Sequence, residues 1–354
     1  MTREELINNV KEGEIIEKAD LSGMDLSGAD LAGGIFEDVS FAKANLANAI
    51  LKESIFNEAD FSGADMTGVT MPDAIMTKPR FPNVRLAGAD MTKATLTEAD
   101  LSGADLSGAN LFHTNVIDAD LSGALLKDTN LEHTIFKGAV LPDADFSGAN
   151  MRRTFLMEAD LTKTVLTNAR FDLTFMMSCN LSGLDLKEMH FVLTQFQKSN
   201  LSGVDFSGSD LTQVNFTESD LSRARLDRAT AGYAMFTKTK MTAASLKGAM
   251  LKYTNFQEAE LNLADFTGAD LEQAIFEKAV CKAAVFAGAN LTCSDFSHAD
   301  ISGANMSRAS IYRTKLHRIV EEHTNWTGTI RKLALGTDKE LAEAEDFVFA
   351  EESK

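Results

Sequence analysis

The chain has 354 residues, a net charge of −18, 44% hydrophobic residues and only three cysteines. This acidity disfavours direct binding of nucleic acid through a basic surface. Three widely spaced cysteines do not form a disulfide framework, which favours a reducing compartment, so we expect a cytoplasmic protein. No stretch reaches the roughly 18 apolar residues of a membrane helix or forms a signal-peptide core. We therefore expect no membrane association.

Residues 1–18 precede the periodic part of the chain and predict a short N-terminal capping helix. Thr2 followed by Glu5 matches a capping box, and Leu6 and Val10 give the helix an apolar side. Stacked strands leave an open edge that pairs readily with other chains. We expect this helix to cover that edge as a lid; a partner-binding helix is the alternative.

Residues 19–317 repeat one five-residue phrase, which is most regular in residues 99–111. Every fifth residue from Leu21 to Leu316, which we call the centre, is large and apolar with few exceptions, and the residue two before it is usually small. A period of five matches neither a helix nor a flat strand. Two inward positions per five, followed by a Ser-Gly pair, predict a short straight segment and then a corner. Four such sides make a coil of about twenty residues, and coils stack about 4.8 Å apart.

The phrase A-[DN]-L-S-G resembles that of the pentapeptide-repeat family. The resemblance covers residues 19–317 and implies an all-β fold, a right-handed quadrilateral parallel β-helix of about fifteen coils. Residues 318–354 then form a C-terminal cap and acidic tail, in which Trp326 would plug the open end. In some relatives a C-terminal segment mediates dimerisation, a role that the resemblance implies for residues 347–349.

One of the four faces carries apolar side chains where the other faces carry Asp or Asn. Its inward centres are mostly phenylalanine, and large apolar residues also occupy its outward positions. An apolar stripe on the outside of an acidic protein indicates a surface for a partner or for self-association. The alternative is that β-branched residues simply suit a strand. The predicted interaction face consists of Ile35, Ile55, Ile75, Ile117, Ile135, Phe155, Met157, Phe175, Met177, Met235 and Ile275.

Two irregular zones interrupt the repeat. Prolines cluster in residues 72–82, and because proline cannot donate to a strand ladder, they predict a bulged coil. Leu184 and Met189 replace small inward residues, so the coil there should widen. Local repacking explains both zones, and a docking feature is the alternative.

The sequence shows no catalytic motif, and we expect no catalytic, cofactor or metal site. Outward Asp side chains should bond the next corner. His113 and His133 should stack one coil apart between Lys93 and Arg153, an arrangement without a carboxylate that disfavours a metal. Cys179 and Cys281 should be packing residues, and Cys293 should face outward. A basic cluster should balance local charge, or else dock an acidic partner; its members are Arg223, Arg225, Arg228, Lys238, Lys240, Lys247 and Lys252.

These observations favour a non-enzymatic protein–protein interaction scaffold or adaptor. Its partner would be another protein, or a second copy joined through the apolar face or the C-terminal tail. The opening residues 2–31 and the interruption at 228–234 resemble pentapeptide-repeat proteins associated with bacterial type VI secretion, which implies an accessory of effector loading. The alternative is a DNA mimic that binds DNA gyrase, as some family members do. About 70 Å of duplex carries about 40 charges, far more than the −18 of this chain.

Overall fold

The computed structural model describes residues 1–347 and divides into two compact units. Unit 1 contains residues 1–181 and 189–195, and unit 2 contains residues 182–188 and those from 196 onward. No helix within residues 1–347 is long and apolar enough to cross a bilayer.

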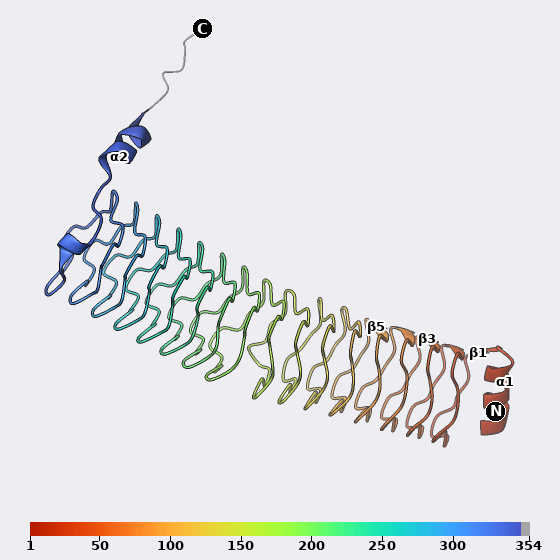
Figure 1. Ribbon diagram of the computed structural model, residues 1–354. Helices are drawn as coiled ribbons and strands as arrows, with labels where there is room; N and C mark the ends of the chain where they lie inside the picture. Colours follow the sequence, from red (N-terminus) through yellow and green to blue (C-terminus); the bar gives the residue numbers. More distant parts are fainter. Residues whose placement is uncertain (348–354) are drawn as a thin grey trace, which may run out of the picture. The chain divides into compact units, whose positions relative to one another are not determined.

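Unit 1 begins with helix α1 (Arg3–Lys11), which lies beside the first coil (Figure 1). The predicted capping box is present: the Glu5 amide donates to the Thr2 hydroxyl, and the Thr2 amide donates to the Glu5 carboxylate. Leu6 and Val10 are buried, and Arg3 donates to the carbonyl of Ser27 at 2.6 Å. These contacts are those expected of a lid.

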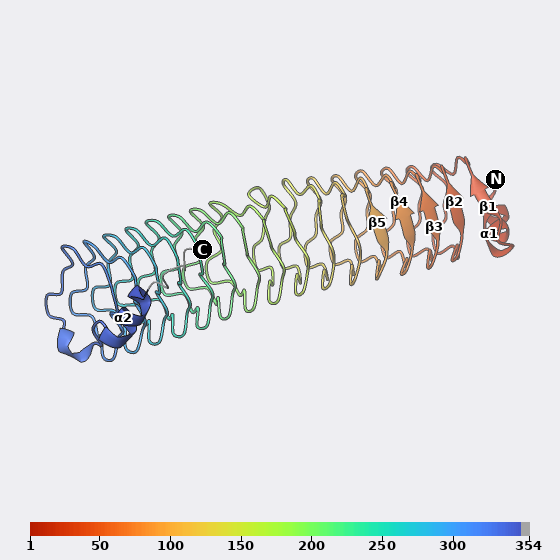
Figure 2. The same ribbon diagram turned by 90° about the horizontal axis from the view of Figure 1, so that it is seen from above.

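Five short parallel strands follow on one face of unit 1, each paired with the next in chain order (Figure 2). Their bounds are β1 (Ile15–Glu17), β2 (Ile35–Glu37), β3 (Ile55–Asn57), β4 (Ile75–Thr77) and β5 (Thr95–Thr97). Every pair is in a register of twenty residues, so that Ile15 lies opposite Ile35 and Ile35 opposite Ile55.

Isolated parallel bridges continue the twenty-residue register in both units, from Asp20 opposite Ser40 to Lys315 opposite Leu335. The bridging positions are five residues apart, which gives each coil four sides. The predicted parallel β-solenoid is therefore confirmed. The coil count differs from the expectation of fifteen, because regular strands join only about four turns and single bridges join the others.

The two inward positions of each repeat form the core, as the sequence predicts. Leu101 and Ala104 are fully buried, and the same pattern recurs through both units. Buried phenylalanine rings stack along the coils: Phe36 lies 4.7 Å from Phe56, and Phe256 lies 4.7 Å from Phe236. Burial of these side chains supplies the main apolar stabilisation of each coil.

Each corner is a β-turn that begins at the centre. In residues 101–104 the amide of Ala104 donates to the carbonyl of Leu101, and Gly103 has a φ of 63°. Because only the second central residue has positive φ, the corner has the form of a type II turn. The positive φ at the second central position explains why the repeat often has glycine there, after the serine.

The prediction of a bulged coil at residues 72–82 is wrong. The parallel register of twenty passes through this zone, with Asp60 opposite Arg80 and Arg80 opposite Asp100. Pro72 and Pro82 occupy the first central position of a corner, where the fixed φ of proline suits a type II turn. These two prolines therefore suit their corners. The ladder also continues through Pro79, whose carbonyl accepts from the Asp100 amide at 3.0 Å.

Outward Asp side chains bind the following corner, as predicted. The amide and hydroxyl of Thr162 both donate to Asp160, at 2.9 and 2.7 Å. Hydrogen bonds from the Thr162 side chain and then its amide hold the pKa of Asp160 below its usual range. These carboxylates therefore stabilise the corners by hydrogen bonds, and their role is structural.

Unit 2 ends with a 3-10 helix η1 (Arg331–Leu333) and helix α2 (Lys339–Asp346). Trp326 is half-buried, donates to Glu321 at 3.0 Å and lies under the Arg331 guanidinium. Helix α2 has no buried residue. The predicted dimerisation segment lies outside the described residues except for Phe347, which is 67% exposed.

The division between the units falls within residues 182–195, where Leu184 and Met189 replace small inward residues. Both side chains are only half-buried, whereas Ala104 and Ala109 at equivalent positions are buried. The chain therefore does not fit these two large side chains fully into its core, and the widened coil stays a prediction.

Candidate functional site

Three residues of the predicted apolar face, Ile35, Ile55 and Ile75, lie in one row of unit 1. Ile15, which the predicted face does not include, lies opposite Ile35 and extends this row. We call the row of four isoleucines the outer ladder. Their Cα atoms are opposite one another in consecutive strands β1 to β4. Ile15 and Ile75 are 52% and 49% exposed, and the two between them are half-buried. The row ends at Thr95. Four adjacent apolar side chains thus form an uninterrupted stripe one residue wide.

A second apolar row lies further along the same face of unit 1. Ile135, Phe155 and Phe175 occupy successive bridging positions, and the two phenylalanine rings stack at 4.7 Å. Met157 and Met177 follow two residues after these phenylalanines, and Met177 is 37% exposed. Ile117, the remaining predicted residue of this unit, is half-buried. Two separate apolar rows therefore stand where the sequence predicts one face.

The predicted residues of unit 2 do not form such a row. Met235 and Ile275 are 42% and 39% exposed. Asn255 bridges to both of them and separates them. The two predicted residues of unit 2 are therefore not adjacent to each other.

Exposed apolar residues also occur elsewhere in the described chain, either singly or, for Tyr233 and Tyr253, as a pair of rings stacked at 4.7 Å. Val140 is 50% exposed, and the residues twenty positions before and after it are Asp120 and Asp160. The residues twenty positions before and after Val165 are likewise aspartates, Asp145 and Asp185. Because scattered apolar residues are ordinary on protein surfaces, continuity and not exposure distinguishes the outer ladder.

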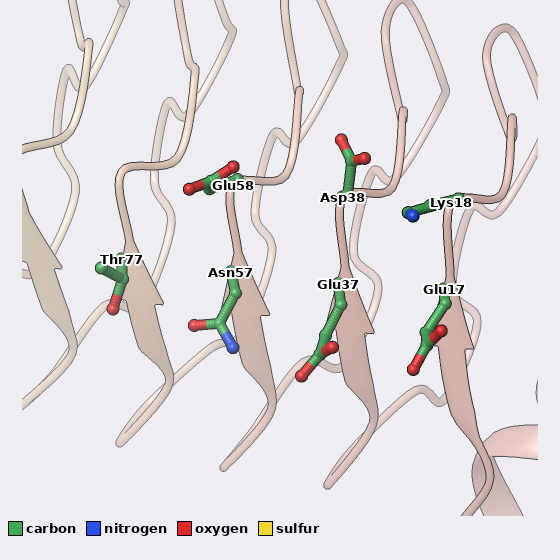
Figure 3. A pocket seen from close by; sticks show the side chains of 7 residues that line it. All are labelled: Glu17, Lys18, Glu37, Asp38, Asn57, Glu58 and Thr77. Atoms are coloured by element: carbon green, nitrogen blue, oxygen red, sulfur yellow. The ribbon is translucent and has the colours of Figure 1, made fainter.

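An acidic trough of about 480 Å³ runs beside the outer ladder (Figure 3). Glu17 and Glu37 lie on the outer surface of the same strands as the isoleucines, and Asp38 and Glu58 lie at the adjoining corner. Within the described residues these four carboxylates form no ion pair and no side-chain hydrogen bond, and Lys18 is the one cation among the lining residues. We call this group the acidic trough.

The corresponding corner of unit 2 is compensated by its own cations. Lys198 pairs with Glu218 at 3.8 Å, and Lys238 pairs with Glu258 at 3.7 Å. Positions 198, 218, 238 and 258 fall in the same place of the twenty-residue frame as Asp38 and Glu58. The same row of unit 1 also contains Lys18 and Lys78, so the sequence pattern does not reveal the trough. Lys78 pairs with Glu98 at 3.3 Å and leaves Glu58 without an ion pair among the described residues.

The predicted basic cluster of unit 2 is largely neutralised by neighbouring carboxylates. Lys247 pairs with Asp265 at 3.2 Å, and Lys252 pairs with Glu272 at 2.8 Å. Arg225 lies near two carboxylates in the same way. Lys238 also pairs, with Glu258, so four of the seven members of the cluster are balanced by neighbouring carboxylates.

The remaining candidate groups lie where the sequence places them. The rings of His113 and His133 stack at 4.4 Å, and burial followed by the charge of His113 lowers the pKa of His133. Cys179 and Cys281 are buried, and Cys293 is exposed. Burial raises the pKa of the Cys179 thiol to about 12, so this thiol is a packing group.

A cluster that the sequence does not reveal joins α2 to the last coils of unit 2. The Nε2 atoms of His298 and His317 each lie 3.1 Å from a different oxygen of Glu345, and Arg318 Nε lies 3.2 Å from the same carboxylate. A pocket of about 410 Å³ adjoins them. The repeat predicts nothing about this contact, because Glu345 lies outside it.

The hydrogen bonding of the buried His317 disfavours a metal at this cluster. The amide of Asp338 donates to His317 Nδ1 at 3.1 Å. That bond leaves the neutral ring with its proton on Nε2, the atom that faces Glu345. A metal-bound histidine instead donates from its second nitrogen to an acceptor. The cluster thus acts as a polar attachment for α2.

The comparisons with known proteins identify the repeat. A family model described as pentapeptide repeats matches residues 35–72, 80–277 and 279–318. A comparison with curated protein sequences finds no match. No comparison tests the resemblance to type VI secretion-associated proteins, which stays a prediction.

Three solved structures illustrate the similarity. HetL from the cyanobacterium Nostoc sp. strain PCC 7120, a pentapeptide repeat protein involved in heterocyst differentiation regulation, is 25% identical over 77% of this chain and 90% of its own, with a TM-score of 0.26. QnrB1, a plasmid-mediated fluoroquinolone resistance protein, is 16% identical over 73% and 90%, with a TM-score of 0.28. A pentapeptide repeat protein of the Arabidopsis thaliana thylakoid lumen is 30% identical over 38% and 69%, with a TM-score of 0.18. With the family model matching most of its length, the chain belongs to the pentapeptide-repeat family.

Proposed function

We propose that this protein is a non-enzymatic scaffold that binds another protein through the apolar rows of unit 1. The continuous outer ladder carries the proposal. Contiguous exposed apolar surface on an otherwise acidic protein marks an interaction site. The second row, with its stacked Phe155 and Phe175, adds aromatic side chains of the kind that dominate binding energy.

The conformation of the wall supports a scaffold role. Outward side chains stand on a backbone whose bridges repeat every twenty residues, and their carboxylates are engaged at the corners. Such a wall presents side chains at fixed spacing, so a partner gains affinity without ordering a flexible loop.

The gyrase-binding DNA mimic is less well supported. Such a mimic needs uncompensated negative charge along its length, as duplex DNA carries one charge about every 1.7 Å. In this chain, lysine side chains pair with several of the outward aspartates. The pairs include Asp145 with Lys127, Asp265 with Lys247 and Asp300 with Lys282. A supercoiling assay with purified gyrase tests this alternative, and inhibition at micromolar protein would favour it over the scaffold.

Photocrosslinking combined with affinity capture tests the scaffold. A photoreactive amino acid would replace Ile55 or Phe155 in the intact protein, and Val140 would carry the same group as an exposed control on another face. We expect a defined protein adduct at positions 55 and 155 and none at 140. Type VI secretion components among the adducts would support the narrower role in effector loading.

Charge-insertion variants provide the second arm of the test. Phe155→Asp/Phe175→Asp should lose the captured partner, whereas the matched Val140→Asp variant should retain it. Circular dichroism would establish that each variant is folded. Recovery of the same proteins with the wild type and with Phe155→Asp/Phe175→Asp would contradict the proposal.

A further inference from the structure

We infer that the outer ladder and acidic trough of unit 1 bind a basic amphipathic helix of another protein. The inference rests on the proposed scaffold function and specifies the partner of one apolar row. Its site is confined to residues 15–75, all within unit 1.

The spacing of the ladder selects a helix over an extended strand. Adjacent coils are about 4.8 Å apart, so three steps from Ile15 to Ile75 span about 14 Å. In an extended strand, residues on the same face recur about every 6.7 Å, so they would not stay aligned with isoleucines about 4.8 Å apart. Residues i, i+3, i+7 and i+10 of a helix span about 15 Å along one face. Four apolar side chains of three helical turns therefore match four isoleucines.

The width of the apolar stripe fixes the direction of the helix. Each strand offers one outward isoleucine followed by one inward residue and one polar outward residue, as in Ile15–Glu17. A helix lying along a strand would contact a single isoleucine. A helix lying across β1 to β4 contacts all four, and one flank of that helix then faces the acidic trough.

The charge of the trough specifies the flank of the partner. Glu17, Glu37, Asp38 and Glu58 form no ion pair within the described residues, because Lys18 lies beside them unpaired and Lys78, the next residue of the row, pairs with Glu98 at 3.3 Å instead. At the equivalent corner of unit 2, Glu218 and Glu258 are paired with lysines. Lysine or arginine side chains on one side of the bound helix would form ion pairs with these carboxylates. Complementary charge raises both the specificity and the association rate of an interface.

The same charge disfavours a second copy of the chain as occupant. Two copies packed ladder to ladder would bring two acidic troughs together in a protein with a net charge of −18. Like charges at an interface oppose association. Nucleic acid and anionic lipid surfaces are disfavoured for the same reason.

Designed peptides test the inference with the full-length protein. The probe is a fluorescein-labelled helical peptide with Leu at i, i+3, i+7 and i+10 and Lys along one flank. A second peptide has Glu in place of Lys. In fluorescence anisotropy at low salt, we expect the Lys peptide to bind at least about tenfold more tightly than the Glu peptide, and we expect added salt to reduce this difference.

Protein variants separate the contributions of the ladder and the trough. Ile35→Ser/Ile55→Ser should abolish binding of the Lys peptide. Glu37→Gln/Glu58→Gln should weaken it about tenfold and remove most of its salt dependence. Glu218→Gln/Glu258→Gln, at the matched corner of unit 2, should leave the affinity unchanged.

Three results would overturn the inference: equal binding of both peptides, no binding of the Lys peptide, or binding unaffected by the ladder variant. None of them affects the scaffold proposal, because that proposal is judged by the adducts at positions 55 and 155. A partner crosslinked at 155 together with failure of the Lys peptide would leave the scaffold supported and this inference refuted.

Discussion

Removal of the Phe256 ring tests how the stacked core stabilises unit 2. Phe256 is fully buried, with its ring 4.7 Å from Phe236, 4.8 Å from Phe276 and edge-on to Phe266 at 5.7 Å. Replacing a buried phenylalanine by alanine costs about 3–5 kcal/mol. Each of the three aromatic contacts contributes about 0.5–1.5 kcal/mol beyond the buried area. We therefore expect Phe256→Ala to lower the free energy of unfolding by about 4–5 kcal/mol.

Two further substitutions isolate the sources of this loss. Phe256→Leu keeps most of the apolar volume but removes the ring contacts, so we expect a loss of about 1–2 kcal/mol. Tyr253→Ala removes a ring that is 41% exposed and stacked only on Tyr233, and it should cost about 1 kcal/mol or less.

Guanidinium unfolding followed by far-UV circular dichroism measures these differences. Because each coil contacts chiefly its neighbours, a solenoid can unfold in parts. Hydrogen exchange of the amides in residues 236–276 would therefore accompany the equilibrium measurement. A loss below about 1 kcal/mol for Phe256→Ala, or equal losses for the Ala and Leu variants, would refute the stacking argument.

Three other predictions follow from the same structure. Gly34→Ala should destabilise by about 1–3 kcal/mol, because the added Cβ would lie 2.6 Å from the buried Phe36 ring; Gly33→Ala, with a φ of 70° and open space, should cost about 1 kcal/mol by the same unfolding assay. Iodoacetamide should alkylate exposed Cys293 in the native protein and Cys179 only after unfolding, as mass spectrometry would show; native labelling of Cys179 would contradict its burial. The lowered pKa of carboxyls such as Asp160 stabilises the fold above the unfolded-state pKa near 3.9 and is lost as pH falls through the lower folded-state value. The Tm should therefore stay level from pH 7 to 5 and fall below about pH 4, and an unchanged Tm at pH 3 would refute this role of the corners.

The candidate interaction site divides into a part that follows from sequence and a part that does not. The outer ladder follows because parallel coils align residues twenty apart, so Ile35 and Ile55 must be neighbours once the period is known. The acidic trough depends on which side chains actually pair. Glu58 at one corner has no cation partner within the described residues, whereas Glu258 at the matched corner has Lys238. The period alone does not distinguish them.

The sequence by itself determined the repeat, its inward positions and its corners, because each depends on residues only a few positions or one coil apart. Tertiary structure decided the features that lack a period. Pro82 fits a type II corner within an unbroken register, a matter of backbone geometry that proline's missing donor does not reveal. Glu345 meets His298 and His317 through a helix outside the repeat, and only the folded chain brings such distant residues together.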